Sequence, residues 1–203
     1  MITLKNICKK FDNKVVLCNF SHSFEGGITI IMGKSGSGKT TLINLILGLL
    51  KPDSGEIEYK IGGKTDLKDI QFGVVFQEDR LFESFTALEN IAAINEKNAL
   101  EFLKKVKLEN EFKKKVYNLS GGMKRRLALA RALAVNPDYL ILDEPFIGLD
   151  KKTKREILDL VKEYGKEIPA IIILHDLPDA KYLDGKIINL KDYASLDKLA
   201  DDS

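Results

Sequence analysis

The sequence predicts an α/β fold with a mainly parallel sheet, helices on both sheet faces, an antiparallel N-terminal β part and an inserted helical segment. Two apolar segments, "DYLILDEP" and "AIIIL", have the short, continuous hydrophobic character of strands buried on both faces of a parallel sheet. Segment 87–115 is rich in Lys and Glu at helical spacing and has few strand-forming residues. These patterns predict a single domain over residues 1–203, with a helical subdomain inserted at about residues 85–130.

Each element follows from its local pattern. The first 24 residues mix β-branched and apolar residues and lead to a Gly-Gly break, which predicts strands and a turn. The apolar strand 28–32 leads into an apolar helix over 40–50, which we expect to end at Lys51-Pro52. Segment 52–64 predicts a turn and a hairpin. The remaining expected elements are strands at 70–77, 138–145, 170–174 and 186–190, an amphipathic helix at 151–165, and a short helical tail.

Composition limits the classes of function. Lys and Arg number 32 against 30 Asp and Glu, so the net charge of +2 gives no reason to expect a nucleic-acid partner. No apolar stretch approaches the ~18 residues that span a bilayer, and the N-terminus lacks a signal-peptide pattern. Cys8 and Cys18 are too few for a disulfide framework, so we expect reduced thiols in a cytoplasmic protein. The two histidines lack partners at metal-ligand spacing, and the basic run 113–115 is interpreted as a solvated helix face.

The segment "GKSGSGKTT" at residues 33–41 fits G-x-x-x-x-G-K-[ST] and lies between an apolar strand and a helix. Its glycines allow positive φ and close backbone approach, so that successive N–H groups can point into one concavity. The helix N-terminus adds positive partial charge. We therefore predict a nucleoside triphosphate site in which Lys39 reaches the β- and γ-phosphates and the Thr40 hydroxyl ligates Mg²⁺. The expected binding residues are Gly33, Lys34, Ser35, Gly36, Ser37, Gly38, Lys39, Thr40 and Thr41.

The strand in "LILDEP" ends in two acids, Asp143 and Glu144. Side chains at the carboxyl ends of parallel strands face the ligand crevice of such a sheet. Asp143 is therefore placed to hold Mg²⁺ directly or through water, and Glu144 to orient or deprotonate an attacking water. The alternative is a strand that ends in a charged turn before Pro145.

With these motifs in this order, the chain resembles an ATP-binding-cassette (ABC) nucleotide-binding domain, a P-loop NTPase, over nearly its whole length. "GKSGSGKTT" is similar to the family's Walker A motif, "LSGGM" at 119–123 to its signature, and "YLILDEP" to its Walker B motif. Met123 departs from the more usual Gln at the end of the signature. The resemblance implies ATP and Mg²⁺ as ligands. It also implies catalytic roles for Glu144, His175 and Lys39, and metal contacts for Thr40, Gln77 and Asp143.

Several residues also allow a simpler interpretation. The resemblance places Phe11 against adenine, yet Phe11 could be part of the core. His175, at the end of "AIIIL", could be a satisfied structural histidine, and Gln77 a polar strand end. Asp150 in "GLD" could act across a dimer interface or only cap the helix that follows.

The signature segment "NLSGGMKRRLALARAL" raises the question of a second anion site. Ser120 is a good N-cap, and Gly121 and Gly122 leave backbone N–H groups exposed at a positive helix end. Because the phosphate loop already surrounds its own triphosphate, the resemblance implies that these residues, with Asp150, contact the nucleotide of a second copy in an ATP-sandwich dimer. Arg125 and Arg126 are either interface contacts or solvated surface.

The resemblance implies an ATP-hydrolysing motor subunit that drives separate transmembrane permease subunits, at the inner face of the cell membrane. Within the family, the chain is most similar to nitrate, sulfonate and taurine-type importers, so a substrate-binding protein is a further expected partner if the system imports. The alternative is a soluble cassette ATPase that acts on DNA or ribosomes. Such proteins usually carry two cassettes or a long inserted coiled coil, and this chain has neither. We expect no nucleic-acid partner.

Overall fold

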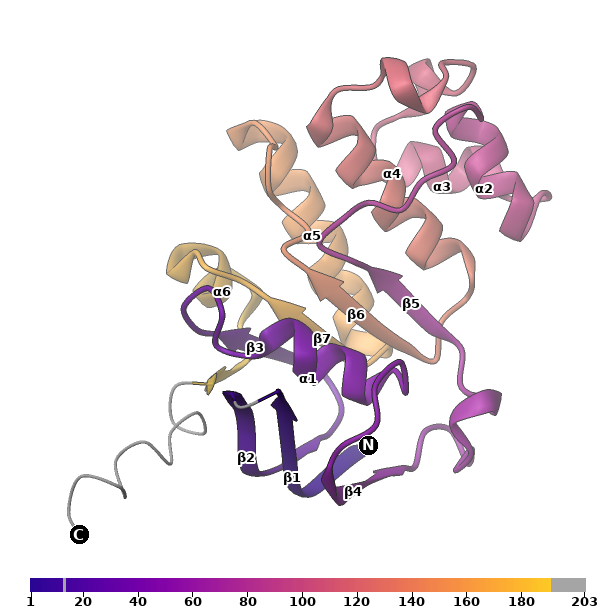
Figure 1. Ribbon diagram of the computed structural model, residues 1–203. Coiled ribbons are helices and arrows are strands. Elements are labelled where there is room, and N and C mark those ends of the chain that lie inside the picture. The colour runs from indigo at the N-terminus through magenta and orange to yellow at the C-terminus, as the bar shows by residue number, and fades with distance from the viewer. Residues whose placement is uncertain (13, 191–203) are drawn as a thin grey trace, which may run out of the picture.

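A computed structural model describes residues 1–12 and 14–190 of the chain. Its centre is a parallel sheet of five strands in the order β5-β6-β7-β3-β8 (Figure 1). Every pair of neighbours in this sheet is parallel, as the continuous apolar strands predicted. The strands are β3 (Ile28–Met32), β5 (Phe72–Val75), β6 (Tyr139–Asp143), β7 (Ala170–Ile173) and β8 (Lys186–Asn189).

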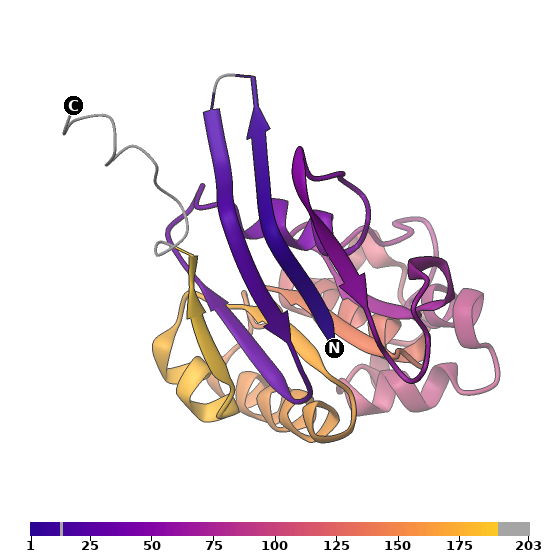
Figure 2. The same cartoon turned by 90° about the horizontal axis from the view of Figure 1, so that it is seen from below.

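A second, antiparallel sheet has the order β2-β1-β4 and lies nearest the viewer in Figure 2. Its strands are β1 (Ile2–Phe11), β2 (Lys14–Phe24) and β4 (Ser54–Tyr59). Helix α1 (Lys39–Ile46) packs between the two sheets, since Leu42, Ile43 and Ile46 share one buried cluster with residues of both. The predicted combination of a parallel and an antiparallel sheet is confirmed.

The parallel sheet separates two hydrophobic clusters because strand side chains alternate between its faces. On β3, Ile31 joins the cluster with α1 and the antiparallel sheet, whereas Ile30 joins the cluster on the other face. The same alternation holds on β6, where Ile141 and Leu142 belong to opposite clusters. Helices α4 (Gly121–Ala134), α5 (Lys151–Glu167) and α6 (Leu177–Leu183) cover the face opposite α1 (Figure 1).

The expected helical insertion contains α2 (Ala87–Asn95) and α3 (Ala99–Lys105), which pack against α4. Thr86 begins α2 with a capping box, in which its hydroxyl accepts from Glu89 N–H and the Glu89 carboxylate accepts from Thr86 N–H. Short 3₁₀ turns occupy Leu67–Asp69, Glu109–Glu111 and Val116–Asn118. Within residues 1–12 and 14–190, none of the helices has both the length and the apolar character needed to cross a membrane.

Three local predictions are wrong. Helix α1 ends at Ile46, before Lys51, because Gly48 turns the chain with φ +68° and leaves Leu49 57% exposed. Segment 52–64 forms the predicted turn, in which Ile61 and Lys64 exchange both backbone hydrogen bonds, but not a hairpin of two strands, since β4 pairs with β1. The run 113–115 is exposed but not helical.

Two further expectations concern the ends of the chain. Cys8 and Cys18 are free, half-buried thiols that face each other across β1 and β2, with their sulfurs 3.5 Å apart. The predicted helical tail after residue 190 lies outside the described residues.

Candidate nucleotide site

The phosphate loop takes its shape from glycines at positions that other residues would strain. Gly36 and Gly38 have φ of +76° and +91°. A Cβ atom on Gly38 would also lie 2.9 Å from Cγ1 of Val16, so β2 passes too close for a larger residue. The buried Ser37 hydroxyl has no hydrogen-bond partner among the described residues. The backbone of a glycine-shaped helix start fits a phosphate.

Lys39 begins α1 and folds back over the loop. Its ammonium donates to the carbonyls of Gly33 and Lys34, each at 2.9 Å. Burial lowers the pKa of Lys39, while the nearby carboxylates of Glu144 and Asp143 act in the opposite direction. The side chain is 8% exposed and its cation is held at the mouth of the loop, where an anion would meet it.

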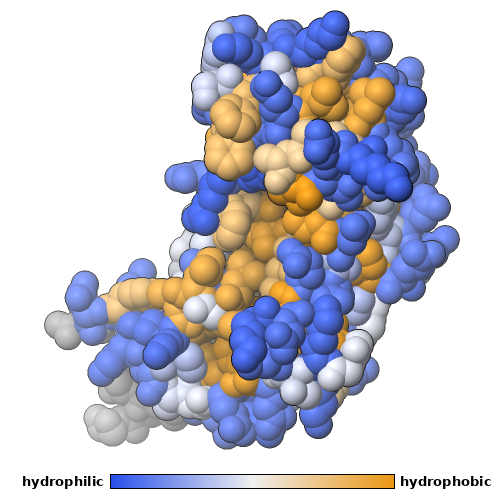
Figure 3. Space-filling model, turned by 90° about the vertical axis from the view of Figure 1, so that its right-hand side faces the viewer, coloured by the Kyte–Doolittle hydropathy of each residue, from blue (hydrophilic) through white to orange (hydrophobic). Residues whose placement is uncertain are grey.

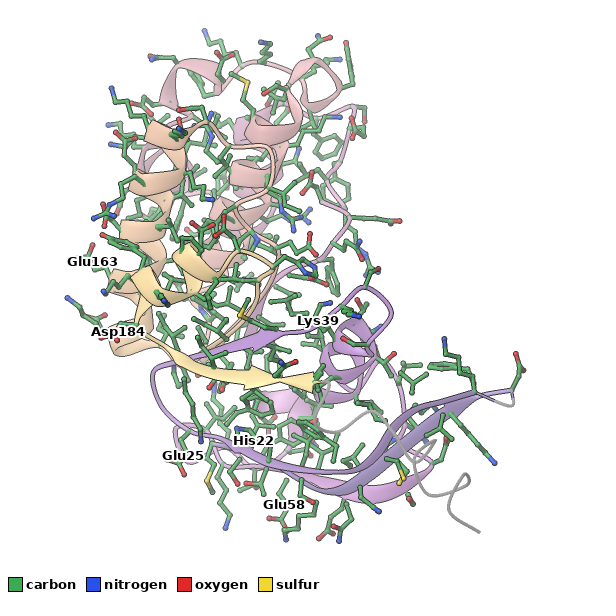
Figure 4. The ribbon with its side chains drawn as sticks, turned by 90° about the vertical axis from the view of Figure 1, so that its left-hand side faces the viewer. His22, Glu25, Lys39, Glu58, Glu163 and Asp184 are labelled. Atoms are coloured by element: carbon green, nitrogen blue, oxygen red, sulfur yellow. The ribbon has the colours of Figure 1, made fainter. Side chains whose placement is uncertain are left out.

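A pocket of about 250 Å³ opens beside this loop. Figure 4 shows Lys39 at the start of α1, with His22 and Glu58 farther away on the antiparallel sheet. Residues from both sheets and from four loops meet in the pocket, and the described part of the chain brings most of the predicted site together here. The lining residues are Phe11, Val16, Ser35, Gly36, Gly38, Lys39, Thr40, Thr41, Gln77, Asp143, Glu144 and His175. Three of the predicted phosphate-loop residues do not line it: Gly33, Lys34 and Ser37.

The exposure of Phe11 distinguishes between its two interpretations, a base-stacking ring and a core residue. Phe11 is 44% exposed and lines the pocket at the end of β1, so it is not a core residue. The Lys9 ammonium lies 5.6 Å from the centre of its ring. An exposed aromatic ring at the rim of a nucleotide-sized pocket offers a face for stacking a base.

The carboxyl end of β6 supplies an acidic wall. Asp143 is 5% exposed, and burial raises its pKa above the ordinary value, with the Glu144 charge adding to the rise. Arg125 and Lys39 oppose that shift without cancelling it. Asp143 and Thr40 line the same pocket, and a carboxylate and a hydroxyl are oxygen ligands of the kind that Mg²⁺ prefers. No group of three or more His, Cys, Asp or Glu side chains that could hold a metal occurs in the described residues, so Mg²⁺ would need phosphate oxygens as additional ligands.

Glu144 and His175 form a pair at the ends of two adjacent strands. Nε2 of His175 lies 2.6 Å from Oε1 of Glu144. Glu144 has φ +53°, an uncommon conformation for a residue with a side chain, and its N–H donates to Ile173 O on β7 at 3.1 Å. His175 is half exposed in the pocket and its Nε2 is paired with Glu144, so its catalytic role stays a prediction beside the interpretation of a satisfied structural histidine. The pair is placed to accept or donate a proton next to the phosphate loop.

The signature residues lie apart from this pocket. Ser120 caps α4, as predicted, because its hydroxyl accepts from Met123 N–H at 3.3 Å. Close packing also requires glycine at position 122, because a Cβ atom there would lie 2.5 Å from Gly148 O. Neither Ser120 nor Gly121 nor Gly122 lines the pocket that contains Lys39.

Asp150 caps α5, because its carboxylate accepts from the N–H groups of Lys152 and Thr153 at 3.1 and 3.0 Å. The capping interpretation is therefore confirmed. A role across a dimer interface stays a prediction.

The prediction that Arg125 is an interface contact or solvated surface is wrong, whereas an interface contact of Arg126 stays a prediction. Arg126 donates to the carbonyls of Val106 and Lys107, within the helical part of the chain. Arg125 is 5% exposed and points into the protein beneath the pocket. A periodicity signal was available, because Arg125 falls on the same helical stripe as the buried Leu129 and Ala132, four and seven residues on.

A glycine-shaped phosphate loop before a helix, facing a parallel strand that ends in two carboxylates, defines a P-loop NTPase. A family model described as ABC transporter matches residues 19–147. The probable sulfate/thiosulfate import ATP-binding protein CysA of Chlorella vulgaris is 35% identical over 94% of this chain and 87% of that protein. The taurine import ATP-binding protein TauB of Escherichia coli O157:H7 is 34% identical over 94% of this chain and 79% of its own length.

Solved structures agree with these relatives. A dimeric ATP-binding cassette in a post-hydrolysis state, bound to ADP and Pi, superposes with a TM-score of 0.82 at 34% identity. The match covers 93% of this chain and 94% of that chain. The chain spans only 58% of another relative, the spermidine/putrescine import ATP-binding protein PotA of Mycoplasma mycoides, which is 33% identical to it. The chain belongs to the ABC transporter family and is an ATP-hydrolysing cassette, and the predicted fold class is confirmed.

Proposed function

We propose that this cassette is the motor subunit of a membrane transporter and that two copies close around two ATP molecules. One observation carries the proposal: the pocket beside Lys39 holds the phosphate loop, the acidic strand end and His175, whereas Ser120 and its glycines lie outside it. A signature helix end that cannot serve its own nucleotide is available to a neighbour's. The dimeric cassettes among the solved relatives support this arrangement.

Within one copy, each residue has a role set by its position. Lys39 and the loop N–H groups bind the triphosphate, and Phe11 stacks on the base. Thr40, Asp143 and Gln77 would hold Mg²⁺, which would supply charge neutralisation at the phosphate oxygens. Glu144 accepts a proton from the attacking water, and His175 keeps the Glu144 carboxylate in place and stabilises charge on the transferring phosphoryl group.

Between copies, a two-fold axis would place each signature against the other copy's γ-phosphate. Ser120, Gly121 and Gly122 then supply a hydroxyl and helix-terminal N–H groups, and Asp150 lies two residues after Gly148, whose carbonyl packs against Gly122. Hydrolysis removes the γ-phosphate that joins the halves, so the dimer opens. Each cycle of closing and opening is the motion that a permease can use.

The membrane partner would dock beside the Gln77 loop, with the cassette at the inner face of the membrane. Figure 3 shows apolar residues running across the face that carries β5 and α2. Phe82 and Phe85, in the segment between those elements, are 52% and 42% exposed, and their rings lie 5.2 Å apart. Exposed aromatic pairs of this kind mark protein contacts. The helical subdomain at about residues 85–130 borders this surface.

The names of the relatives bear on the direction of transport. Two of them are named for sulfate/thiosulfate and taurine import. A third is named for spermidine/putrescine import, so the names agree on import and not on the substrate, and we propose an importer whose permease receives its substrate from a substrate-binding protein.

Affinity purification of the tagged chain from detergent-solubilised membranes tests the transporter assignment. We expect a multi-span membrane protein to co-purify, and the double variant Phe82→Glu/Phe85→Glu to lose it while keeping basal ATPase activity. Ile187→Glu is the matched control, because Ile187 is 44% exposed on β8, away from this surface. Recovery of only ribosomal or DNA-bound proteins would overturn the assignment in favour of a soluble cassette.

A further inference from the structure

The buried guanidinium of Arg125 reaches the carboxyl end of β6. Its Nε donates to the carbonyl of Glu144 at 3.0 Å, and its Nη2 donates to the carbonyl of Asp143. Both acceptors are backbone atoms of the two acids that wall the nucleotide pocket. Glu144 has φ +53°, a conformation that is unfavourable for residues with a side chain. The hydrogen bonds from Arg125 stabilise the backbone in this conformation.

The same guanidinium also binds the loop that carries Gln77. Its Nη1 donates to Phe76 O at 2.6 Å and to Gln77 O at 3.4 Å, and it pairs with Oδ1 of Asp79 at 2.8 Å. The carboxylate of Asp79 neutralises a charge that would otherwise be costly to bury. Arg125 therefore joins two segments of the chain that both line the nucleotide pocket.

The helix that carries Arg125 holds this loop at a second point. Arg131, six residues further along α4, donates through Nη2 to Asp79 O at 3.1 Å. Within the loop itself, the guanidinium of Arg80 stacks over the Phe76 ring, with its carbon 3.9 Å from the ring centre. The loop is thus fixed to α4, and α4 begins at Ser120.

We propose that Arg125 is a positioning residue that makes the signature helix, the Gln77 loop and Glu144 move as one unit. The inference rests on the proposed function, in which Gln77 lies next to the permease surface and Glu144 accepts the proton from water. A displacement of the Gln77 loop would then be transmitted to the backbone of Glu144 through the side chain of Arg125. Only a planar fork of five donors can serve this many acceptors in two directions, so a lysine cannot replace it.

The test compares Arg125→Gln and Arg125→Lys with Arg126→Gln. We expect both Arg125 variants to lose about 10- to 100-fold in kcat while the KM for ATP stays within about twofold, since the phosphate loop is untouched and a misplaced base slows chemistry. Arg126→Gln removes the neighbouring guanidinium, which donates to the carbonyls of Val106 and Lys107 and, within the described residues, not to the Gln77 loop or to Glu144. It should lower thermal stability and leave kcat within about threefold.

Asp79→Ala covers the case in which Arg125 variants do not fold, because Asp79 is partly exposed. It should lower kcat by a few fold with the KM unchanged. Wild-type kcat in Asp79→Ala, recovery of activity by lysine, or equal kcat losses in Arg125→Gln and Arg126→Gln would each overturn the inference. If Glu144→Gln hydrolyses ATP normally, the proposed function fails. If Glu144→Gln is inactive and Arg125→Gln behaves like Arg126→Gln, only this inference fails.

Discussion

Replacing Glu144 by glutamine should lower the turnover number for ATP by about 100- to 10,000-fold, which is the range for loss of a general base. The amide keeps the shape of the side chain but cannot take a proton from water. ATP binding should persist, because Lys39 and the loop N–H groups are unchanged. Steady-state phosphate release and binding of a fluorescent ATP analogue measure the two quantities separately.

The same variant should also change the assembly. Because the γ-phosphate stays uncleaved, gel filtration with ATP should show a stable dimer, and gel filtration without ATP should show the monomer. His175→Gln is a useful companion, since it removes the group 2.6 Å from the Glu144 carboxylate and should also reduce kcat. A Glu144→Gln protein that turns over at the wild-type rate and never dimerises would contradict the assigned role.

Lys39→Met should have the second large effect, a loss of ATP affinity of roughly 100-fold or more. The ammonium is buried at the mouth of the loop, and removing one partner of a buried charge pair costs about 2–5 kcal/mol. Methionine keeps the length and the apolar stem of the side chain. Equilibrium binding of labelled ATP measures the loss.

Lys34→Met is the matched control for this experiment. Lys34 lies in the same loop, but its carbonyl accepts from Lys39 and its side chain does not line the pocket. Its affinity for ATP should stay within about threefold of wild type. Equal losses in the two lysine variants would mean that net loop charge, rather than the Lys39 ammonium, binds the phosphates.

The parts of the site that depend on consecutive residues could be predicted from the sequence. A phosphate loop is built from the backbone of one short segment, so "GKSGSGKTT" contains nearly all of its geometry. Apolar strands such as "AIIIL" likewise indicate burial on both sheet faces. The N-caps at Ser120 and Asp150 are equally local, and both form as expected.

The missed features depend on contacts between distant segments. Arg125 was misjudged because its acceptors lie 18 to 49 residues away in the chain and only the fold brings them together. The turn after β4 forms as the local pattern predicted, but the partner of β4 is β1, about 50 residues earlier, and no local pattern indicates that pairing. The early end of α1 had a local signal, since Gly48 is a typical helix terminator within an apolar run.

The central claim, that each signature acts on the other copy's nucleotide, is tested most directly by mixing two inactive variants. Ser120→Arg blocks the signature with its own pocket intact, and Glu144→Gln disables the pocket with its own signature intact. The two proteins are combined before ATP is added, so that mixed dimers can form. Each mixed dimer then contains one complete site, and random pairing would restore up to about a quarter of wild-type turnover. Activity of the mixture well above the sum of the separate variants is the predicted result, and activity no greater than that sum would contradict the claim.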